Sequence, residues 1–236
     1  LVSESLSLQL SDLLDRIGTK LQICPTQHQQ AEERYKRIAE WLSDDGSSLA
    51  AYSPTIYSQG SLRIGTTVRP PTRQEYDLDL VLELQCDWRQ IQNPVVLLNA
   101  VEARLKQHDV YRTMLSRKNR CIRVRYANEF HLDILPACPD VASGVDCVVV
   151  PDREARAWKA SNPKGYAEWF EKRAESFKVE FAKQVEPLPD WQPSQARPPL
   201  SRAVQLLKRW RDVTYSKTPE VAPISIVLTT LAGHNY

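Results

Sequence analysis

The chain has 236 residues, of which 42% are hydrophobic and 25% charged, and its formal net charge is +2. This length suits one large domain or two small lobes, and the small net charge excludes a protein that coats nucleic acid through bulk charge. No apolar run approaches the roughly 18 residues of a membrane span. Residues 1–10 also lack the basic start of a signal peptide. We therefore expect a cytoplasmic protein with no membrane partner.

The cysteines favour neither a zinc site nor a disulfide framework. They number five, they occur singly, and none belongs to a CxxC pair: Cys24, Cys86, Cys121, Cys138 and Cys147. The odd count and irregular spacing argue against a structural role for either chemistry. Most of them are expected to be small core residues.

The first 85 residues predict two helices, a loop and a strand. Apolar residues recur at helical spacing over residues 3–17 and 26–43, which predicts an amphipathic helix in each segment. Residues 53–74 are interpreted as a loop. Residues 76–85, which read "YDLDLVLELQ", alternate between polar and apolar side chains at every position except Val81 and predict the strongest strand of the chain.

The middle of the chain predicts one helix and three strands. A helix is expected over residues 93–108, with Asn93 as its N-cap and Pro94 as its first residue. The segments "CIRVRY" (121–126) and "FHLDILPA" (130–137) are separated by a short link and predict a hairpin. Residues 147–151 predict one more short strand.

After residue 160 the pattern becomes helical. Helices are expected over residues 161–184, 199–215 and 222–236, with a proline-rich connector over 187–199. The last of these helices has no clear stop signal, so we expect the complete protein to continue beyond it. The predicted class is α+β, with two lobes that enclose a cleft. A mixed lobe covers residues 1–155 with the N-terminal helices, and a helical lobe covers residues 156–236.

Asp77 and Asp79 pose the central question of the sequence. Side chains at positions i and i+2 of a strand share a face, so the two carboxylates point the same way while the alternating leucines face the core. Such a pair is repulsive unless a cation lies between the oxygens. Two interpretations are open at this point, a solvated strand face and a cation site.

The strand over residues 130–137 favours the cation site. Asp133 shares a face with His131 and can join the first two carboxylates if the two strands are neighbours. Three carboxylates suit Mg²⁺, and two such ions about 3.5–4 Å apart can activate a hydroxyl and stabilise a leaving phosphate. We interpret His131 as a packing or supporting residue rather than a ligand.

Gly60 and Ser61 precede the carboxylate strand and suit a phosphate. Glycine lets the backbone approach a ligand closely, and the serine offers a hydroxyl and a backbone N–H. A Gly-Ser pair alone is a weak signal, because turns are full of such pairs. It gains meaning when an Asp-x-Asp strand and a later aspartate follow it.

These motifs resemble the nucleotidyltransferase superfamily of DNA polymerase β. The phrases "QGSLRIGTTVRP", "EYDLDLVLEL", "NPKGYAEWFEKR" and "RAVQLLKRWRD" look like the bacterial CD-NTases, which are relatives of cyclic GMP-AMP synthase and oligoadenylate synthetase. The likeness runs from about residue 25 to the end of the chain. It implies a polymerase β-like nucleotidyltransferase core, a mixed sheet flanked by helices, followed by a helical lobe.

The resemblance also implies roles for particular residues. The three aspartates would be the catalytic ligands of two Mg²⁺ ions, or of Mn²⁺ ions in their place. The donor triphosphate would be held by Gly60, Ser61, Lys208 and Ser225. Two of these have ordinary alternatives, since Lys208 can be a solvated helix cation and Ser225 can be a helix N-cap.

Several arginines remain to be placed. Arg63 and Arg69 follow the Gly-Ser pair and are expected to approach phosphates, Arg63 being the candidate nucleotide contact. Residues 117–125 carry five cations. This cluster is interpreted as a solvated edge that discourages sheet aggregation, and the alternative is a rim that binds nucleotide or an activator.

The function implied by the resemblance is Mg²⁺-dependent synthesis of a cyclic di- or trinucleotide in bacterial anti-phage signalling. The substrates would be ATP together with GTP or another nucleoside triphosphate, and a regulatory protein is a further expected partner. The zinc ribbon of the animal DNA sensor has no counterpart here, so activation by double-stranded DNA is not implied. The alternatives are a nucleotidyltransferase that modifies RNA, protein or a small molecule, and a catalytically silent nucleotide-binding relative.

Overall fold

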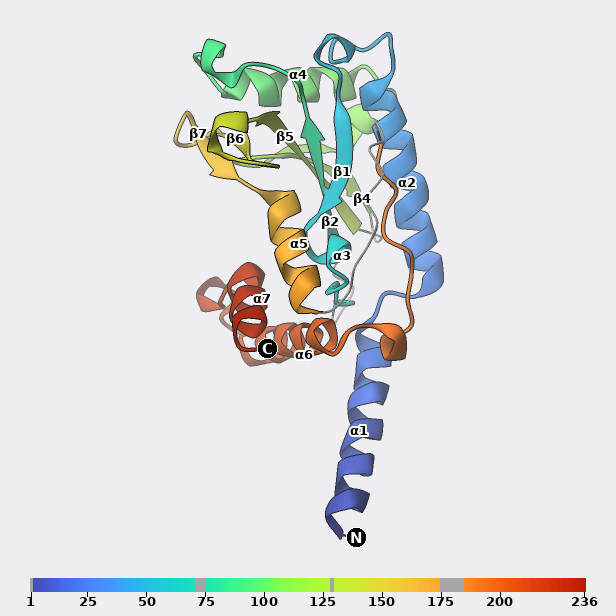
Figure 1. Cartoon of the computed structure of the whole chain (residues 1–236). Coiled ribbons are helices and arrows are strands. Elements are labelled where there is room, and N and C mark those ends of the chain that lie inside the picture. The colour runs from blue at the N-terminus through green and yellow to red at the C-terminus, as the bar shows by residue number, and fades with distance from the viewer. Residues whose placement is uncertain (1, 71–74, 128–129, 175–184) are drawn as a thin grey trace.

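A computed structural model describes residues 2–70, 75–127, 130–174 and 185–236. Its centre is a mixed β-sheet with helices on both faces (Figure 1). Five strands lie in the order β1 (Thr55–Gln59), β2 (Tyr76–Glu83), β5 (Phe130–Pro139), β4 (Ile122–Tyr126) and β3 (Leu115–Arg117). The central pair, β2 and β5, is parallel, whereas the other neighbours are antiparallel. Two more strands extend the far end of β5, namely β6 (Val148–Asp152) and β7 (Ala157–Ser161).

The alternating leucines of β2 build the main core. Leu78, Leu80, Leu82 and Leu84 are completely buried. They face α2 (Pro25–Ser43) and α4 (Val95–Lys106), whose apolar residues belong to the same cluster. The burial of one strand face at period 2 and of one helix stripe at period 3.6 is what the sequence pattern predicts. The opposite face of β2 is therefore left to its polar residues.

The remaining helices stand around that second face. They are α3 (Gly60–Arg63), α5 (Pro163–Arg173), α6 (Pro199–Thr214) and α7 (Ser225–His234). A smaller core that includes Phe170, Leu200 and Val204 joins α5 to α6. The first helix, α1 (Val2–Leu21), contacts α6 and then extends away from the body of the molecule (Figure 1).

Short 3₁₀ helices occupy several connections. Their bounds are Ala50–Tyr52, Trp88–Gln90, Tyr111–Thr113, Val141–Ser143, Ser194–Ala196 and Pro219–Val221. None of the helices among the described residues is long and apolar enough to cross a membrane.

The structure corrects part of the sequence prediction. The predicted loop over residues 53–74 is wrong at its start, because β1 and α3 lie there. Strands β3 and β7 were also missed. The helix expected from Asn93 begins at Val95, whose N–H is accepted by the Asn93 side chain at 3.1 Å. The described part of the helix predicted over residues 161–184 ends at Arg173, and its predicted tail over 175–184 lies outside the described residues.

The cysteines correct the prediction as well. Only Cys138 is buried, Cys24 is exposed, and the other three are half-buried. The expectation that most of them are core residues is therefore wrong.

Candidate active site

The sheet register brings the predicted carboxylates to one face. In the parallel pair of β2 and β5, Asp79 stands opposite Asp133 and Asp77 stands opposite His131. Side chains at paired positions of neighbouring strands project from the same face. The predicted adjacency of the two strands is thus confirmed, and Asp77, Asp79 and Asp133 lie on the face that the leucines leave free.

Gly60 lies directly against Asp79. Strand β1 pairs with β2 so that Gln59 stands opposite Asp79, and the chain then turns into α3 at Gly60. Gly60 has a φ of +67°, and a Cβ at this position would lie 2.4 Å from Oδ2 of Asp79. Only glycine tolerates both the backbone conformation and this close approach. Gly60 therefore lies against the Asp79 carboxylate in space, as well as preceding it in the sequence.

A cleft of about 1280 Å³ opens in front of these residues. Its walls come from the start of α3, the segment that follows it, β2, α6 and α7. Six of the eight predicted site residues line it: Gly60, Ser61, Asp77, Asp79, Lys208 and Ser225. Asp133 and Arg63 do not. The volume exceeds that of the usual small-ligand site and leaves room for more than one nucleotide-sized ligand.

The surroundings of Asp77 and Asp79 disfavour the negatively charged form of both carboxylates. Burial, together with the nearby charges of Asp133 and Asp77, raises the pKa of Asp79 to about 7. The pKa of Asp77 is also raised, by its partial burial, against a lowering effect of Arg123. Clustered carboxylates whose charge is disfavoured in this way are typical of functional sites.

Arg123 supplies the main counter-charge. Its Nε and Nη2 each donate to one oxygen of Asp133 at 2.7 Å, and Nη2 also lies 3.0 Å from Oδ1 of Asp77. The side chain of Arg123 is 17% exposed, so the prediction of a solvated edge is wrong for this residue. The signal that could have found it is the hairpin register, which places Arg123 opposite Asp133.

Two other cations of the same cluster are also paired. Arg117 contacts Glu102 at 2.7 Å, and Arg120 contacts Asp152 at 2.9 Å. Both cations are more than half exposed, which agrees with the solvated edge that was predicted there. Salt bridges of this kind contribute little to stability.

The chemistry of the three aspartates fits a hard divalent cation, because all donors are carboxylate oxygens. As the side chains stand, no three His, Cys, Asp or Glu residues of the described chain are gathered closely enough to hold a metal ion. Arg123 engages both oxygens of Asp133 and one of Asp77. The three carboxylates that could bind a cation are present, and Arg123 binds three of their oxygens.

A row of side chains on and just before α6 holds the segment after Ser61. Four donors meet four consecutive backbone carbonyls: Arg197 to Gly65 (2.7 Å), Ser201 to Ile64 (3.3 Å), Gln205 to Thr67 (2.8 Å) and Lys208 to Thr66 (3.0 Å). We call these four contacts the α6 row. Within the helix, the donors are spaced by four and three residues and so share one helix face.

Lys208 combines this structural contact with a place in the cleft. Its ammonium also lies 3.0 Å from the Thr66 hydroxyl, and the residue is 7% exposed, so the alternative of a solvated helix cation is wrong. Burial lowers the pKa of Lys208 to about 8, while the negative charge of Asp79 opposes that effect. A desolvated ammonium that faces a cleft suits an anionic ligand.

Ser225 opens α7 and meets Arg211. Its hydroxyl accepts a hydrogen bond from Nη1 of Arg211 at 2.5 Å. The N-cap of α7 is Ile224, so the alternative role of Ser225 as the N-cap is wrong. Arg211, which sequence reasoning missed as a site residue, also lines the cleft and pairs with Asp212. This corner therefore offers a hydroxyl, a guanidinium and a helix start to an anion.

Arg63 is placed elsewhere. It forms an ion pair with Glu171 of α5, and the two side chains are 11% and 10% exposed. Arg69 is exposed, and its carbonyl accepts a hydrogen bond from Arg209. Neither Arg63 nor Arg69 belongs to the residues that line the cleft. The geometry thus lends no support to a phosphate contact for Arg63.

Comparison with known proteins gives a consistent result. Residues 8–174 match the family model described as "Second Messenger Oligonucleotide or Dinucleotide Synthetase domain". The chain is 33% identical, over all of its length and 63% of the relative, to a Roseivirga ehrenbergii protein named "c-di-GMP synthase". It is 29% identical to "Cyclic dinucleotide synthase CdnG" of Bradyrhizobium diazoefficiens, over 95% of this chain and 58% of the relative. The chain thus spans about three fifths of the length of these curated relatives.

A solved structure agrees in fold. The Bradyrhizobium diazoefficiens CD-NTase CdnG, which was solved in complex with GTP, superposes with a TM-score of 0.72 at 27% identity. The match covers 94% of this chain and 68% of that one. The mixed sheet with flanking helices is therefore the fold of that structure.

Proposed function

Because this chain belongs to the family of Second Messenger Oligonucleotide or Dinucleotide Synthetase domains, we propose that it is a nucleotidyltransferase that joins nucleoside triphosphates into a cyclic di- or trinucleotide. Pyrophosphate would be released at each transfer. The observation that carries the proposal is the position of Asp79 opposite Asp133 on two parallel strands. Asp77 lies on the same face, and Gly60 lies against Asp79 at the cleft.

The donor triphosphate would lie between α3 on one side and α6 and α7 on the other. Ser61 offers its hydroxyl and the N–H groups at the start of α3, while Lys208 and Ser225 face it from α6 and α7. Arg211 adds a guanidinium at the same corner. These groups neutralise phosphate charge and fix the reacting atoms, and positioning of this kind supplies most of the catalysis in phosphoryl transfer.

Asp77, Asp79 and Asp133 would hold two Mg²⁺ ions, and Mn²⁺ takes the same ligands. Such ions, when bound, lower the pKa of an attacking ribose hydroxyl and neutralise charge on the leaving phosphates. A site built on all three aspartates requires Arg123 to give up part of its contact with Asp133 or Asp77. Arg123 would then hold Asp133 in place through the remaining bond.

GTP is the first substrate to test, since one relative is named a c-di-GMP synthase and another was solved with GTP. ATP is the second, because the family resemblance in the sequence extends to mixed cyclic dinucleotides. The same resemblance supports a role in bacterial anti-phage signalling, a cytoplasmic location and a regulatory protein partner. Double-stranded DNA is not among the activators that we propose.

The test is an incubation with all four nucleoside triphosphates and Mg²⁺ or Mn²⁺, with mass spectrometry of phosphatase-resistant products. The wild-type chain is expected to give a cyclic product. Asp77→Asn with Asp79→Asn should reduce it at least about a thousandfold, the order of effect seen when charge-stabilising groups are lost. Asp45→Asn, at an exposed position in the loop after α2, is the matched control.

Two outcomes would favour other functions. Label transferred from a triphosphate to added RNA or protein would indicate a nucleotidyltransferase with a macromolecular acceptor. Thermal stabilisation by GTP without any product, with Mn²⁺ as with Mg²⁺, would indicate a nucleotide-binding domain without turnover. Product from the doubly substituted chain would place the active site elsewhere.

A further inference from the structure

A second cavity lies on the other side of the sheet. It has a volume of about 400 Å³ and opens between α2, the segment after α4 and strand β4. This is the sheet face that α2 and α4 cover, whereas the carboxylates of the cleft project from the opposite face. The residues that line it are Arg34, Arg37, Glu40, Trp41, Asp44, His108, Val110, Tyr111 and Tyr126.

Four of the nine residues that line this cavity carry rings, and three of these rings lie against one another. The Trp41 and His108 rings meet edge to face with their centroids 4.9 Å apart, and the His108 ring stacks on Tyr111 at 4.2 Å. Tyr111 and Tyr126 are 5% and 6% exposed and form the floor. Surfaces of this kind bind planar rings by stacking, a contribution of about 1–3 kcal/mol per nucleic-acid base by alanine substitution.

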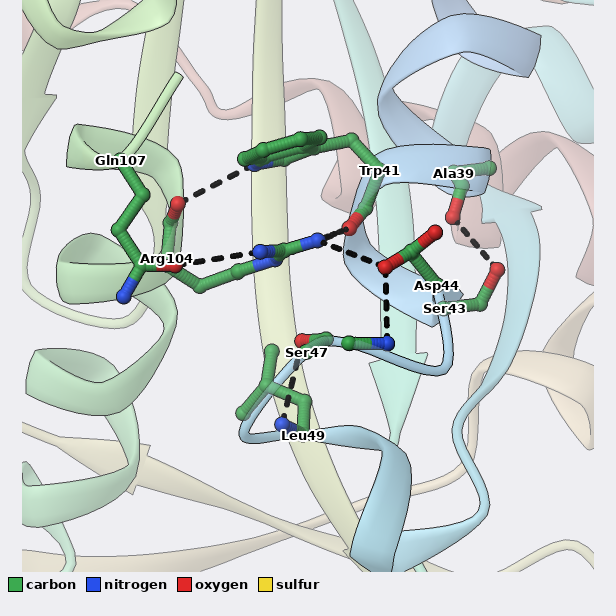
Figure 2. Close-up of polar contacts among 9 residues, drawn as sticks. Ala39, Trp41, Ser43, Asp44, Ser47, Leu49, Arg104 and Gln107 are labelled. Carbon is green, nitrogen blue, oxygen red and sulfur yellow. Dashed lines mark hydrogen bonds and ion pairs between the residues drawn. The ribbon is translucent and has the colours of Figure 1, made fainter.

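The Trp41 wall is fixed before any ligand arrives. The guanidinium of Arg104 lies 3.7 Å from the centroid of the indole ring and donates two hydrogen bonds to the Trp41 carbonyl, at 3.1 and 2.8 Å (Figure 2). The indole Nε1 in turn donates to the carbonyl of Arg104 at 3.1 Å. Arg104 also contacts Asp44 and Gln107, as Figure 2 shows. A ring held in this way loses little conformational entropy on binding.

The charged residues of the cavity are separated along α2. Arg34 and Arg37 lie one turn apart at one end, and Arg34 sits over the Tyr126 ring at 5.2 Å. Arg37 makes no ion pair or side-chain hydrogen bond with any described residue. Glu40 lies three residues further along, on the same helix face. At a rise of about 1.5 Å per residue, about 9 Å separates Arg34 from Glu40 along the helix axis.

His108 presents a donor to the same cavity. Its Nδ1 accepts a hydrogen bond from the Val110 N–H at 3.2 Å. In the neutral ring the hydrogen therefore resides on Nε2, which is left to donate to a ligand. The cavity thus combines ring faces, two cations at one end, the carboxylates of Glu40 and Asp44 at the other and a donor on His108.

We propose that this cavity is a second nucleotide site, which binds a guanosine monophosphate group with its base on the aromatic surfaces. The phosphate would lie at Arg34 and Arg37, where guanidinium groups match its geometry. The guanine edge carries two adjacent N–H donors, which the Glu40 carboxylate would accept. The site is separate from the proposed cleft, so it does not depend on the function assigned there.

The test observes Trp41 directly. The indole N–H signal of Trp41 in a ¹H–¹⁵N spectrum is assigned by its loss in Trp41→Phe, and the intact chain is titrated with GMP in EDTA. We expect a saturable shift of this signal. Guanosine should bind at least about tenfold more weakly, because it lacks the charged phosphate, and inorganic phosphate alone should leave the signal in place.

Matched variants separate this cavity from the rest of the surface. Arg37→Glu should weaken GMP at least about tenfold, since it removes a charge-assisted hydrogen bond and places a like charge beside the phosphate. Lys36→Glu makes the same charge change at the neighbouring exposed position of α2, outside the cavity, and should alter the affinity less than about twofold. Glu40→Gln should reduce the preference for GMP over AMP.

The proposal is overturned by either of two results. One is a Trp41 signal that GMP does not shift. The other is equal weakening of GMP by Arg37→Glu and Lys36→Glu, which would indicate nonspecific attraction to the charge of α2. Asp79→Asn, in the opposite cleft, should leave the Trp41 titration unchanged, and loss of the shift in that variant would also contradict a separate site.

Discussion

Asp79 is the residue on which the electrostatics of the cleft converge. It stands between Asp133 on the neighbouring strand and Gly60 at the start of α3, and burial raises its pKa to about 7. Near neutral pH its carboxylate is thus about as often protonated as ionised when no cation is bound. A ligand that carries positive charge into the cleft would ionise it.

The raised pKa predicts a pH-dependent stability. The pKa of Asp79 is about 7 in the folded chain, whereas the unperturbed carboxyl of an aspartate has a pKa of about 3.8. Between these values the folded state binds more protons than the unfolded state, so this residue costs stability increasingly as pH rises from about 4 to about 7. In EDTA, Asp79→Asn should therefore raise the free energy of unfolding at pH 8 by at least about 1 kcal/mol, since one pKa unit corresponds to about 1.4 kcal/mol.

Urea unfolding at pH 8 and at pH 5 measures the effect. The gain from Asp79→Asn should be smaller at pH 5, where the wild-type carboxyl is largely protonated in the folded state. Asp45→Asn, on the exposed loop, should show no such difference. An equal gain at both pH values would mean that Asp79→Asn stabilises the folded chain for a reason other than the loss of the negative charge.

The sequence predicted the carboxylates better than their counter-charge. The alternation of leucine and aspartate assigns Asp77 and Asp79 to one face without any knowledge of the fold, because strand geometry alone requires it. Arg123 was assigned to a solvated edge, because its pairing depends on the register between β4 and β5. The two segments do not reveal that register by their spacing alone, and a shift of one residue would reverse the face of every side chain.

Strand β4 is the element that controls access to the third carboxylate. Arg123→Met should lower the melting temperature in EDTA, because it leaves Asp133 and Asp77 without their cation. The same variant should gain more in melting temperature from Mg²⁺ than the wild type does, because Arg123 no longer competes for the carboxylate oxygens. Thermal unfolding with and without Mg²⁺ measures both effects independently of turnover.

Arg125→Met is the control on the same strand. Arg125 is exposed, stands opposite His131 and makes no side-chain ion pair with a described residue. Its replacement should change neither the melting temperature in EDTA nor the Mg²⁺ response by much, since exposed charges contribute little. If Arg123→Met lowers the Mg²⁺ response instead, the arginine positions Asp133 for the cation more than it competes with it.

At the scale of elements, long periodic segments were predicted well, whereas among the short strands β4 and β6 were predicted and β1, β3 and β7 were missed. The helices α2 and α6 lie within one or two residues of their expected bounds, since many apolar positions define each stripe. Strand β1 was missed because "TIYSQ" shows neither alternation nor a long apolar run, since its two large apolar residues, Ile56 and Tyr57, are adjacent. Its pairing with β2 nevertheless decides where Gly60 lies.

At the scale of the whole molecule, a buried ion pair joins two helices that lie far apart in the sequence. Arg63 of α3 and Glu171 of α5 form this pair. Glu171→Ala should lower the free energy of unfolding by about 2–4 kcal/mol, because it leaves a buried guanidinium without its carboxylate. Chemical denaturation measures this change.

Glu168→Ala provides the comparison one turn earlier in α5. Glu168 is 45% exposed and lies 3.9 Å from Lys172, so its loss should cost less than about 0.5 kcal/mol. Equal effects of the two substitutions would show that the Arg63 contact does not stabilise the joint between α3 and α5. The division into lobes at residues 1–155 and 156–236 itself remains a prediction.

The α6 row restricts the length of the segment that it holds. Four donors meet the carbonyls of four consecutive residues, Ile64 to Thr67, and three of those donors are spaced by the turns of one helix. Inserting or deleting a single residue in this segment moves the carbonyls out of step with the helix. The number of residues between Ser61 and Val68 is thus fixed, and so is the backbone conformation at Gly65, whose φ of +67° side-chain-bearing residues rarely adopt.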